Sequence, residues 1–380
     1  MNIGIFTDSY LPYTSGVVRS IQTFNRELNK LGHDVFIFAP SYKCCVDEEN
    51  VFRFTSIPSP TNPDFNIAVP FSLRLRPTIK RLNLDLIHVH SPFLLGRLGA
   101  RYARKLGIPL IFTFHTLYDQ YIHYIPFARS FTKELAQRIS RDFCNQCDMV
   151  IVPTEVIGDY LRGIGVEKKI RRVPTGIDVF EYGSGDPEWL RRRYGISQKD
   201  RILLFVGRLG QEKNIGFLLE SFSMIHRKKK NTVLVLVGGG PEEEELRKKA
   251  FELGIGTNVI FTGTLQPEDV VQCYAGADLF LFSSVTETQG LVIAEAKAAG
   301  LPVVAVGAYG VSEMVQDGVD GFLTDQDPYG FAGKVNELLN STSLYRQMSK
   351  KARENAQRFS SANCAAKLVD CYRELLKEYK

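Results

Sequence analysis

Residues 277–296 read ADLFLFSSVTETQGLVIAEA. The apolar run Ala277–Phe282 is typical of a buried strand, and the alanine-rich sequence after Gly290 predicts a helix. Glu287 is therefore expected on a strand-to-helix turn. Gly290 is expected at the start of the helix, and Glu295 near its second turn.

This arrangement suits a ligand that carries phosphate between two sets of hydroxyls. A helix start offers unpaired N–H groups and the positive end of a dipole to an anion. Carboxylates bind hydroxyls and repel phosphate, so Glu287 and Glu295 would hold the two ends of such a ligand. A nucleotide-diphosphate sugar has this shape. Two glutamates eight residues apart also occur on solvated helices, but a strand end followed by a helix start favours ligand binding.

Short apolar runs alternate with helix-like segments along the chain, in two sets. The first set is Ile3–Phe6, Val35–Ala39, Leu86–His90, Leu110–Phe114 and Met149–Pro153, and the second is Ile202–Gly207, Val233–Gly238, Val259–Phe261, Leu279–Ser283 and Pro302–Val306. This alternation predicts two α/β domains, each a doubly wound, Rossmann-like parallel sheet covered on both faces.

The domains are expected to be 1–173 and 174–361, because Pro and Gly break the periodicity within Val173–Asp178. A long helical tail is predicted from about Leu344 to Tyr379, and its last part, about 362–380, is expected to pack back on the first domain. Ligands bind at the carboxyl ends of parallel strands, so the active site is expected in a cleft between the domains.

The composition is that of a soluble globular protein, with 380 residues, 44% hydrophobic and 23% charged. Met1–Phe6 begins directly as a strand, so no signal peptide is expected. No apolar run approaches the ~20 residues that span a bilayer. The seven cysteines are scattered, which suits a reducing cytoplasm.

The basic charge is concentrated in the first half of the chain. The net charge is +5, and residues 1–180 hold 22 Lys and Arg against 16 Asp and Glu. The excess clusters at Arg74, Arg76, Lys80, Arg81, Arg97, Arg101, Arg104, Lys105, Arg129, Lys133, Arg138 and Arg141. An anionic membrane surface would suit these stretches, although a solvated charged face would look the same. No nucleic-acid-binding motif is present.

Three strand ends supply further candidate residues. Arg208 and Lys213 follow the strand Ile202–Gly207, where two cations could neutralise a diphosphate; a surface Lys–Glu pair is the alternative. His115 directly follows a strand and is the best placed of the six histidines. Gly16 lies where the first loop meets its helix, which lets a phosphate or sugar approach the backbone closely.

The loop that ends at Gly16 contains neither the G-x-G-x-x-G dinucleotide fingerprint nor a P-loop, so chemistry based on NAD loses support.

Taken together, these segments resemble the GT-B glycosyltransferases, and within them the retaining family 4. The similar segments occur in the family's order over nearly the whole chain: Ser15–Val17, Pro174–Asp178, Gly207–Leu209, Glu212–Asn214, Gly238–Pro241, Phe261–Gly263, and Glu287 to Glu295 followed by Ala296, Ala299, Gly300 and Pro302. The resemblance implies a nucleotide-sugar donor and no obligatory metal or other cofactor.

The resemblance also implies roles for the donor-site residues. It places the diphosphate on Arg208 and Lys213, the donor sugar on Glu287, and the ribose on Glu295. Further donor contacts are implied for the backbone at Leu265, Gln289, Gly290 and Leu291.

In the first domain, the resemblance places Gly16 at the diphosphate and His115 beside the reacting sugar. The catalytic set it implies is His115, Glu287, Arg208 and Lys213. Two positions depart from the family pattern: Ser15 stands where a glycine is usual, and Thr288-Gln289 follows the first glutamate. The preferred sugar therefore cannot be carried over from the family.

Residues 115–124, HTLYDQYIHY, resemble a segment of bacterial glucosyltransferases that act on diacylglycerol. Tyr118, Asp119 and Tyr121 are therefore expected to bind the acceptor. The predicted reaction is a 1,2-diacylglycerol 3-glucosyltransferase reaction: glucose moves from UDP-glucose to a membrane lipid and forms an α-glycoside. The enzyme would be cytoplasmic and peripheral on the inner face of the cell membrane.

Three alternatives stay open. The same chemistry could act on a soluble sugar or polyol acceptor, because aromatic loops also bind free sugars. A GT-B nucleotide-sugar epimerase would share the architecture, but it would need paired acid–base groups around the sugar. A non-catalytic binding protein would gain little from two cations placed on a leaving group.

Overall fold

The computed structural model describes residues 1–43, 45, 48–60, 64–120 and 133–379. The chain forms two compact units. Unit 1 comprises Met1–Gly176 together with Ser361–Lys380, and unit 2 comprises Ile177–Ser360. The chain therefore passes into unit 2 after Gly176 and returns to unit 1 for its last helix.

The described part of unit 1 contains a seven-stranded sheet in which every neighbouring pair is parallel. The strand order is β3-β2-β1-β6-β7-β8-β9. The strands are β1 (Asn2–Phe6), β2 (Asp34–Pro40), β3 (Val51–Phe54), β6 (Leu86–Val89), β7 (Leu110–Thr113), β8 (Met149–Val152) and β9 (Lys169–Arg172). A separate antiparallel hairpin pairs β4 (Ser56–Pro58) with β5 (Asn66–Ala68).

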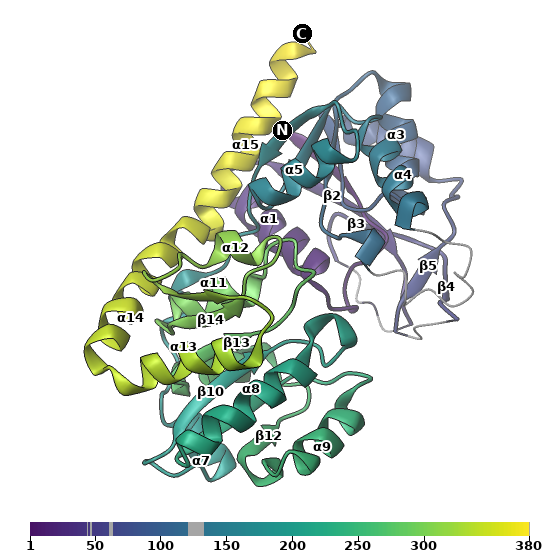
Figure 1. Cartoon of the computed structure of the whole chain (residues 1–380). Coiled ribbons are helices and arrows are strands. Elements are labelled where there is room, and N and C mark those ends of the chain that lie inside the picture. Colours follow the sequence, from purple (N-terminus) through teal and green to yellow (C-terminus); the bar gives the residue numbers. More distant parts are fainter. Residues whose placement is uncertain (44, 46–47, 61–63, 121–132, 380) are drawn as a thin grey trace. The chain divides into compact units, whose positions relative to one another are not determined.

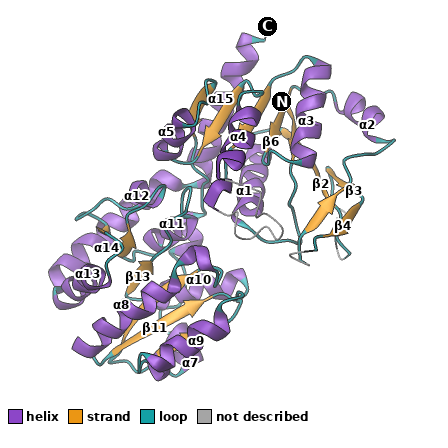
Figure 2. Cartoon of the chain, turned by 45° about the vertical axis from the view of Figure 1, so that its right-hand side comes forward, coloured by secondary structure: helices purple, strands orange, loops and turns teal. Residues whose placement is uncertain are grey.

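Helices cover both faces of this sheet (Figure 2). The described helices of unit 1 are α1 (Gly16–Lys30), α2 (Leu75–Leu82), α3 (Leu94–Leu106), the short 3-10 helix η1 (Tyr118–Gln120), α4 (Lys133–Cys144), α5 (Glu155–Gly163) and α15 (Ser361–Glu378). The last helix belongs to this unit's core: Leu368 and Tyr372 of α15 share one buried cluster with Val18 and Phe24 of α1. Figure 1 shows α15 beside the sheet of unit 1.

Unit 2 contains a six-stranded parallel sheet in the order β12-β11-β10-β13-β14-β15. The strands are β10 (Arg201–Val206), β11 (Thr232–Val237), β12 (Val259–Phe261), β13 (Leu279–Phe282), β14 (Val303–Val306) and β15 (Gly321–Thr324). The helices are α6 (Val179–Tyr182), α7 (Trp189–Tyr194), η4 (Gln211–Lys213), α8 (Ile215–Lys228), α9 (Glu243–Glu252), η5 (Gly256–Asn258), α10 (Pro267–Gly276), α11 (Leu291–Ala298), α12 (Val311–Met314), α13 (Pro328–Asn340), α14 (Thr342–Ala356) and η6 (Gln357–Phe359).

The predicted fold class is confirmed, because both units are parallel α/β sheets covered by helices. The central strands are almost wholly buried and rich in β-branched residues, such as the strand TVLVLV of β11. The helical tail predicted from about Leu344 to Tyr379 is present as α14, the 3-10 helix η6 and α15. The tail is divided at Gln357–Ser360, where Ile177 N donates to Phe359 O at 2.8 Å and the chain leaves unit 2.

Each sheet has a point where the strand order reverses. In unit 1 this point lies between β1 and β6, and in unit 2 between β10 and β13. The loops that follow two such strands diverge to opposite faces of the sheet, and open α/β sheets bind ligands in the crevice left between them.

Candidate functional site

The loops that follow β10 and β13 in unit 2 are joined by direct hydrogen bonds. Ser283 Oγ donates to the carbonyl oxygen of Lys213 at 2.8 Å, and Ser284 Oγ donates to that of Glu212 at 2.8 Å. Both serines are fully buried. The backbone of Lys213 is thereby held beside the loop that carries Glu287.

Lys213 and Glu287 form an ion pair between Nζ and Oε1 across these loops. Their side chains are 18% and 17% exposed, so the pair is shielded but reachable from solvent. The backbone of Glu287 is also fixed, because Gly310 N donates to its carbonyl oxygen at 3.0 Å. A Cβ on Gly310 would lie 2.0 Å from Thr288 O, so this close approach requires glycine.

Two buried polar atoms lie next to this pair in the sequence, Thr286 Oγ1 and Asn214 Nδ2. Neither has a hydrogen-bond partner among the residues that the structure describes. Buried polar groups are rarely left unpartnered, and ligand sites are one place where they are found.

Helix α11 begins as predicted, directly after Gly290. Gly290 adopts a left-handed conformation with φ 86°, and Leu291 is the first helical residue. Gln289 and Gly290 are buried. The first N–H groups of a helix have no intrahelical partner, so this end can accept an anion.

Glu295 lies within α11 and is completely buried. Its Oε2 accepts a hydrogen bond from the Tyr274 hydroxyl of α10 at 2.8 Å. A carboxylate buried in this way is orientated by its partner and can accept hydroxyl donors. The sequence reasoning did not identify Tyr274, because nothing in a tyrosine 21 positions away indicates that it contacts Glu295.

The remaining donor-site candidates lie on the glycine-rich loops that follow β10, β11 and β12. Arg208 is exposed, and the next residue, Leu209, donates its N–H to Gly239 O at 3.0 Å. Gly238 has φ 131°, and a Cβ there would lie 2.1 Å from Gly207 O. Leu265 is half-buried and directly precedes α10, the helix that carries Tyr274.

In unit 1, Asp8 follows β1 at the point where the strand order reverses. Its carboxylate accepts hydrogen bonds from Ser91 Oγ and from Leu95 N at 2.9 Å, so it caps the start of α3. Burial raises the pKa of Asp8. Gly16 lies at the exposed start of α1, where Ser15 Oγ accepts from Val18 N at 3.3 Å. The predicted contact of Gly16 with a diphosphate stays a prediction.

His115 follows β7, and it contacts a second histidine that the sequence reasoning missed. His90 Nδ1 lies 2.8 Å from His115 Nε2, and the two rings stack with centroids 5.1 Å apart. Burial lowers the pKa of His115 to about 3 and that of His90 well below its usual value, so both rings are neutral near pH 7. His90 stands directly after β6, so the strand-end reasoning that selected His115 could also have selected it.

The predicted acceptor residues Tyr118 and Asp119 lie in η1. The Tyr118 ring packs edge-on against Phe93 and Phe114, and burial raises its pKa. Asp119 is buried, and its Oδ2 accepts from Gln137 Nε2 at 3.1 Å. Tyr121 lies outside the described residues. These contacts give Tyr118 and Asp119 packing roles, and their acceptor role stays a prediction.

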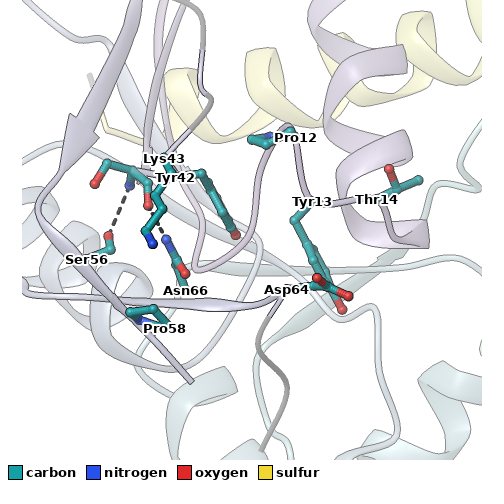
Figure 3. A pocket seen from close by; sticks show the side chains of 10 residues that line it. Pro12, Tyr13, Thr14, Tyr42, Lys43, Ser56, Pro58, Asp64 and Asn66 are labelled. Carbon is teal, nitrogen blue, oxygen red and sulfur yellow. Dashed lines mark hydrogen bonds between the residues drawn. The ribbon is translucent and has the colours of Figure 1, made fainter. Parts of the chain in front are cut away.

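Unit 1 also has a pocket of about 880 Å³ between the first loop, the end of β2 and the β4–β5 hairpin (Figure 3). It is lined by Pro12, Tyr13, Thr14, Ser41, Tyr42, Lys43, Ser56, Pro58, Asp64 and Asn66. Figure 3 shows Lys43, Ser56 and Asn66 at one end and Tyr13 and Asp64 at the other. Its size is within the range of small-ligand sites.

Within the described ranges, no group of three His, Cys, Asp or Glu residues could hold a metal ion. No helix in that part of the chain is long and apolar enough to cross a membrane.

Two family models match the chain, and together they cover most of it. A model described as "Glycosyltransferase Family 4" matches residues 14–180, and one described as "Glycosyl transferases group 1" matches residues 187–355.

Two curated relatives are named alpha-monoglucosyldiacylglycerol synthase. The protein of Streptococcus pneumoniae is 35% identical over 349 residues, which cover 90% of this chain and 79% of that protein. The protein of Acholeplasma laidlawii is 30% identical over 361 residues, which cover 91% of this chain and 88% of that protein.

The fold is similar to that of HepE from Anabaena. The crystal structure of HepE in complex with UDP superposes with a TM-score of 0.80 at 20% identity, covering 99% of this chain and all of that one. A second crystal structure of the same protein holds UDP-glucose and gives a TM-score of 0.78 at 20% identity, covering 98% of this chain and all of that one.

Proposed function

This chain belongs to the glycosyltransferases of family 4 with the GT-B fold, and we propose that it transfers glucose from UDP-glucose to the free hydroxyl of a membrane diacylglycerol. The product would be an α-glycoside, formed with retention of configuration on the inner face of the cell membrane. The observation that carries the proposal is the Lys213–Glu287 pair at the point where the strand order of unit 2 reverses.

The geometry of unit 2 supports a nucleotide-sugar donor. Lys213 and Glu287 are in contact, so one molecule with a phosphate next to a polyol could reach both side chains. The start of α11 would hold a phosphate oxygen, and buried Glu295 would accept the ribose hydroxyls. HepE, whose fold is similar, was crystallised with UDP and with UDP-glucose.

Catalysis would rest on stabilising the leaving diphosphate. Negative charge grows there as the sugar becomes oxocarbenium-like, and Lys213, Arg208 and the start of α11 would face it. Preorganised donors of this kind supply much of an enzyme's rate, and removing one costs roughly 100- to 1000-fold. In front-face attack the acceptor oxygen bonds to the anomeric carbon as the carbon–phosphate oxygen bond breaks. The leaving phosphate takes the acceptor's proton, so no separate base is needed.

Two observations support a lipid acceptor. The relatives from S. pneumoniae and A. laidlawii are named for a glycosylated diacylglycerol. In unit 1, α2 and the residues before it expose Phe71 (70%) and Leu73 (84%) beside four exposed cations, which are Arg74, Arg76, Lys80 and Arg81. Exposed apolar side chains beside cations are typical of a surface that binds anionic membranes.

The activity can be tested by measuring UDP release from UDP-glucose with and without diacylglycerol vesicles. The proposal predicts release that depends on the lipid. An epimerase would convert the donor without net release, and a binding protein would do neither. Release that is equally fast without any acceptor would contradict the transfer reaction.

Membrane binding can be tested by sedimentation with vesicles rich in anionic lipid. Replacing Arg74, Arg76, Lys80 and Arg81 by serine is expected to abolish sedimentation in low salt. The matched control removes three exposed cations from unit 2, Arg227, Lys228 and Lys230, and is expected to sediment like the wild type. Equal loss in both variants would show that net charge, not the surface at α2, causes binding.

The pocket of unit 1 favours a second candidate function, transfer to a soluble sugar or polyol. Its hydroxyl and amide side chains could hydrogen-bond the hydroxyls of such a molecule, and its tyrosine rings could pack against it. A panel of glycerol, inositol and free hexoses, compared with diacylglycerol vesicles, separates the two functions. Faster UDP release with a soluble compound than with vesicles would favour the second one.

A further inference from the structure

Three histidines lie together at the carboxyl ends of β6 and β7 in unit 1. The rings of His88 and His90 pack with centroids 4.3 Å apart and planes tilted by 32°, and those of His90 and His115 are nearly parallel, with centroids 5.1 Å apart. Two of these histidines are also in contact through ring nitrogens: His90 Nδ1 lies 2.8 Å from His115 Nε2.

This contact couples the tautomers of two rings. Burial lowers the pKa of both histidines, so each ring is neutral and carries one proton. A hydrogen bond between two ring nitrogens needs the proton on one of them. If His90 Nδ1 carries it, His115 must be protonated at Nδ1; if His115 Nε2 carries it, His90 must be protonated at Nε2.

The surroundings of His90 favour the first arrangement. His90 is 1% exposed, and its Nε2 has no hydrogen-bond partner in the part of the chain that the structure describes. A proton on Nε2 would therefore be a buried N–H donor without an acceptor. Such orphaned donors are rare in folded proteins, and an unused acceptor is tolerated better. The proton thus belongs on His90 Nδ1.

The His90 ring also packs against His88, which is fixed by hydrogen bonds at both of its nitrogens. His88 Nδ1 lies 2.7 Å from the Tyr372 hydroxyl of α15, and His88 Nε2 lies 2.7 Å from Thr113 Oγ1 of β7. Both nitrogens of His88 are therefore partnered. His88 packs against His90, and its two nitrogens bond to Tyr372 and Thr113, so it is a control for the role of His90.

We propose that His90 is a positioning residue that fixes His115 in the tautomer protonated at Nδ1. His115 is then a neutral ring that carries its proton on Nδ1 and accepts from His90 at Nε2. Resting on the proposed function, this means that neither ring nitrogen of His115 is available to take a proton from the acceptor. That role agrees with a reaction in which the leaving phosphate accepts the acceptor's proton.

The test is a two-dimensional ¹H–¹⁵N NMR spectrum of the full-length protein with labelled histidine, which distinguishes protonated from bare ring nitrogens. The signals are assigned with single histidine variants. The wild-type protein is expected to show His115 protonated at Nδ1 between pH 6 and 8 without any substrate. A wild-type His115 protonated at Nε2 would overturn the proposal, and this outcome depends on no variant folding.

Variants at position 90 test whether His90 sets the tautomer of His115. His90→Phe keeps a stacked ring but removes Nδ1, so His115 is expected to lose its fixed tautomer and kcat to fall about tenfold, the effect of one lost hydrogen bond. His90→Asn keeps an N–H donor near the place of Nδ1 and is expected to restore the tautomer and most of kcat. The donor KM should change little in both variants.

His88→Asn is the matched control, because it changes a buried ring in the same stack. It is expected to lower thermal stability and to leave the tautomer of His115 as in the wild type. If His88→Asn and His90→Phe shift the tautomer equally, or if His90→Phe leaves it unchanged, His90 does not set it. The NMR measurement needs no turnover, so its result is independent of whether the protein catalyses the proposed transfer reaction.

Discussion

Lys213 and Glu287 meet across the two loops where the strand order of unit 2 reverses. A cation and a carboxylate are thereby placed side by side, on loops that Ser283 and Ser284 join. An ion pair between partly exposed side chains adds little to stability, about 1 kcal/mol or less. The arrangement is therefore better explained by ligand binding than by folding.

Lys213→Met should lower kcat/KM for UDP-glucose roughly 100- to 1000-fold, because one charge facing the leaving diphosphate is lost. Its thermal midpoint should stay close to that of the wild type. Steady-state UDP release measures the first effect and calorimetry the second. Lys248→Met is the control, since Lys248 is an exposed lysine that faces Glu252 at 3.9 Å on α9. Equal activity in the two variants would show that Lys213 does not stabilise the leaving diphosphate.

Tyr274→Phe should weaken UDP binding up to about tenfold and cost about 1–3 kcal/mol of stability, because buried Glu295 loses its hydroxyl partner. Titration calorimetry with UDP and urea unfolding measure the two effects. If stability falls while UDP affinity does not change, Glu295 does not hold the ribose.

The sequence predicted well where residues lie when that place follows from the start or end of an element. Glu287, Gly290 and Glu295 were placed by a strand end and a helix start, and the structure has them there. Tyr274 was missed because its contact with Glu295, 21 positions away, leaves no local signal, whereas His90 directly follows a strand and could have been selected in the same way as His115. Such contacts depend on how elements pack, which one sequence does not reveal.

Helix α11 is anchored by a buried ion pair as well as by its apolar face. Lys297 Nζ lies 2.6 Å from Asp320 Oδ2, and it also donates to Met314 O at 2.9 Å. Both side chains are almost completely buried. Since Lys297 is two residues from Glu295, this pair helps to fix the part of the helix that faces the predicted ribose.

Lys297→Met and Asp320→Asn should each destabilise the protein by about 3–5 kcal/mol, because each leaves one buried charge uncompensated. Urea unfolding measures the loss. Lys334→Met breaks an exposed pair with Glu337 on α13 and should cost less than about 0.5 kcal/mol. A cost for Lys297→Met as small as that of the control would show that the pair does not anchor α11.

The histidine stack on β6 and β7 should make stability depend on pH. Burial lowers the pKa of His88 to about 3, whereas the unfolded value is near 6.5. The unfolded state therefore binds the proton first as the pH falls. Stability should be greatest above pH 6.5 and should decrease towards pH 3, by roughly 1.4 kcal/mol per pH unit for His88 alone.

Urea midpoints between pH 7.5 and 4.5 measure this slope, and His88→Asn should flatten it by one proton. An unchanged slope in that variant would mean that His88 is not held neutral.

Buried elements were easier to predict than exposed ones. The central strands β1, β10 and β13 are apolar on both faces, so they stand out in the sequence. The edge strands β3 and β9 were missed because most of their residues are not fully buried and both carry charged residues, as in the strand KIRR of β9. The hairpin strands β4 and β5 are only three residues each, too short for a periodic pattern.

In the whole molecule, the two compact units do not simply follow one another along the chain. Unit 2 is one continuous segment with its own large core, whereas unit 1 needs α15 from the end of the chain. Leu368, Tyr372 and Leu375 of α15 fill the same core as α1. The long helical tail was visible in the sequence, but its break at Gln357–Ser360 follows from where the chain changes units.

Residues 177–360 expressed alone should therefore fold cooperatively and bind UDP. Residues 1–176 alone should not fold, and adding residues 361–380 as a separate peptide should restore helix and protection from proteolysis. Circular dichroism and limited proteolysis measure both outcomes. A stable fold of 1–176 without the peptide would show that α15 is dispensable for unit 1.

The NMR spectrum of the lipid product formed from UDP-glucose and diacylglycerol vesicles shows whether glucose is transferred to the lipid and with which anomeric configuration. We expect a glucosyl-diacylglycerol whose anomeric proton has the small coupling of an α-glycoside. A β-glycoside would contradict retention, and the absence of any glycosylated lipid while the donor is consumed would contradict transfer to diacylglycerol.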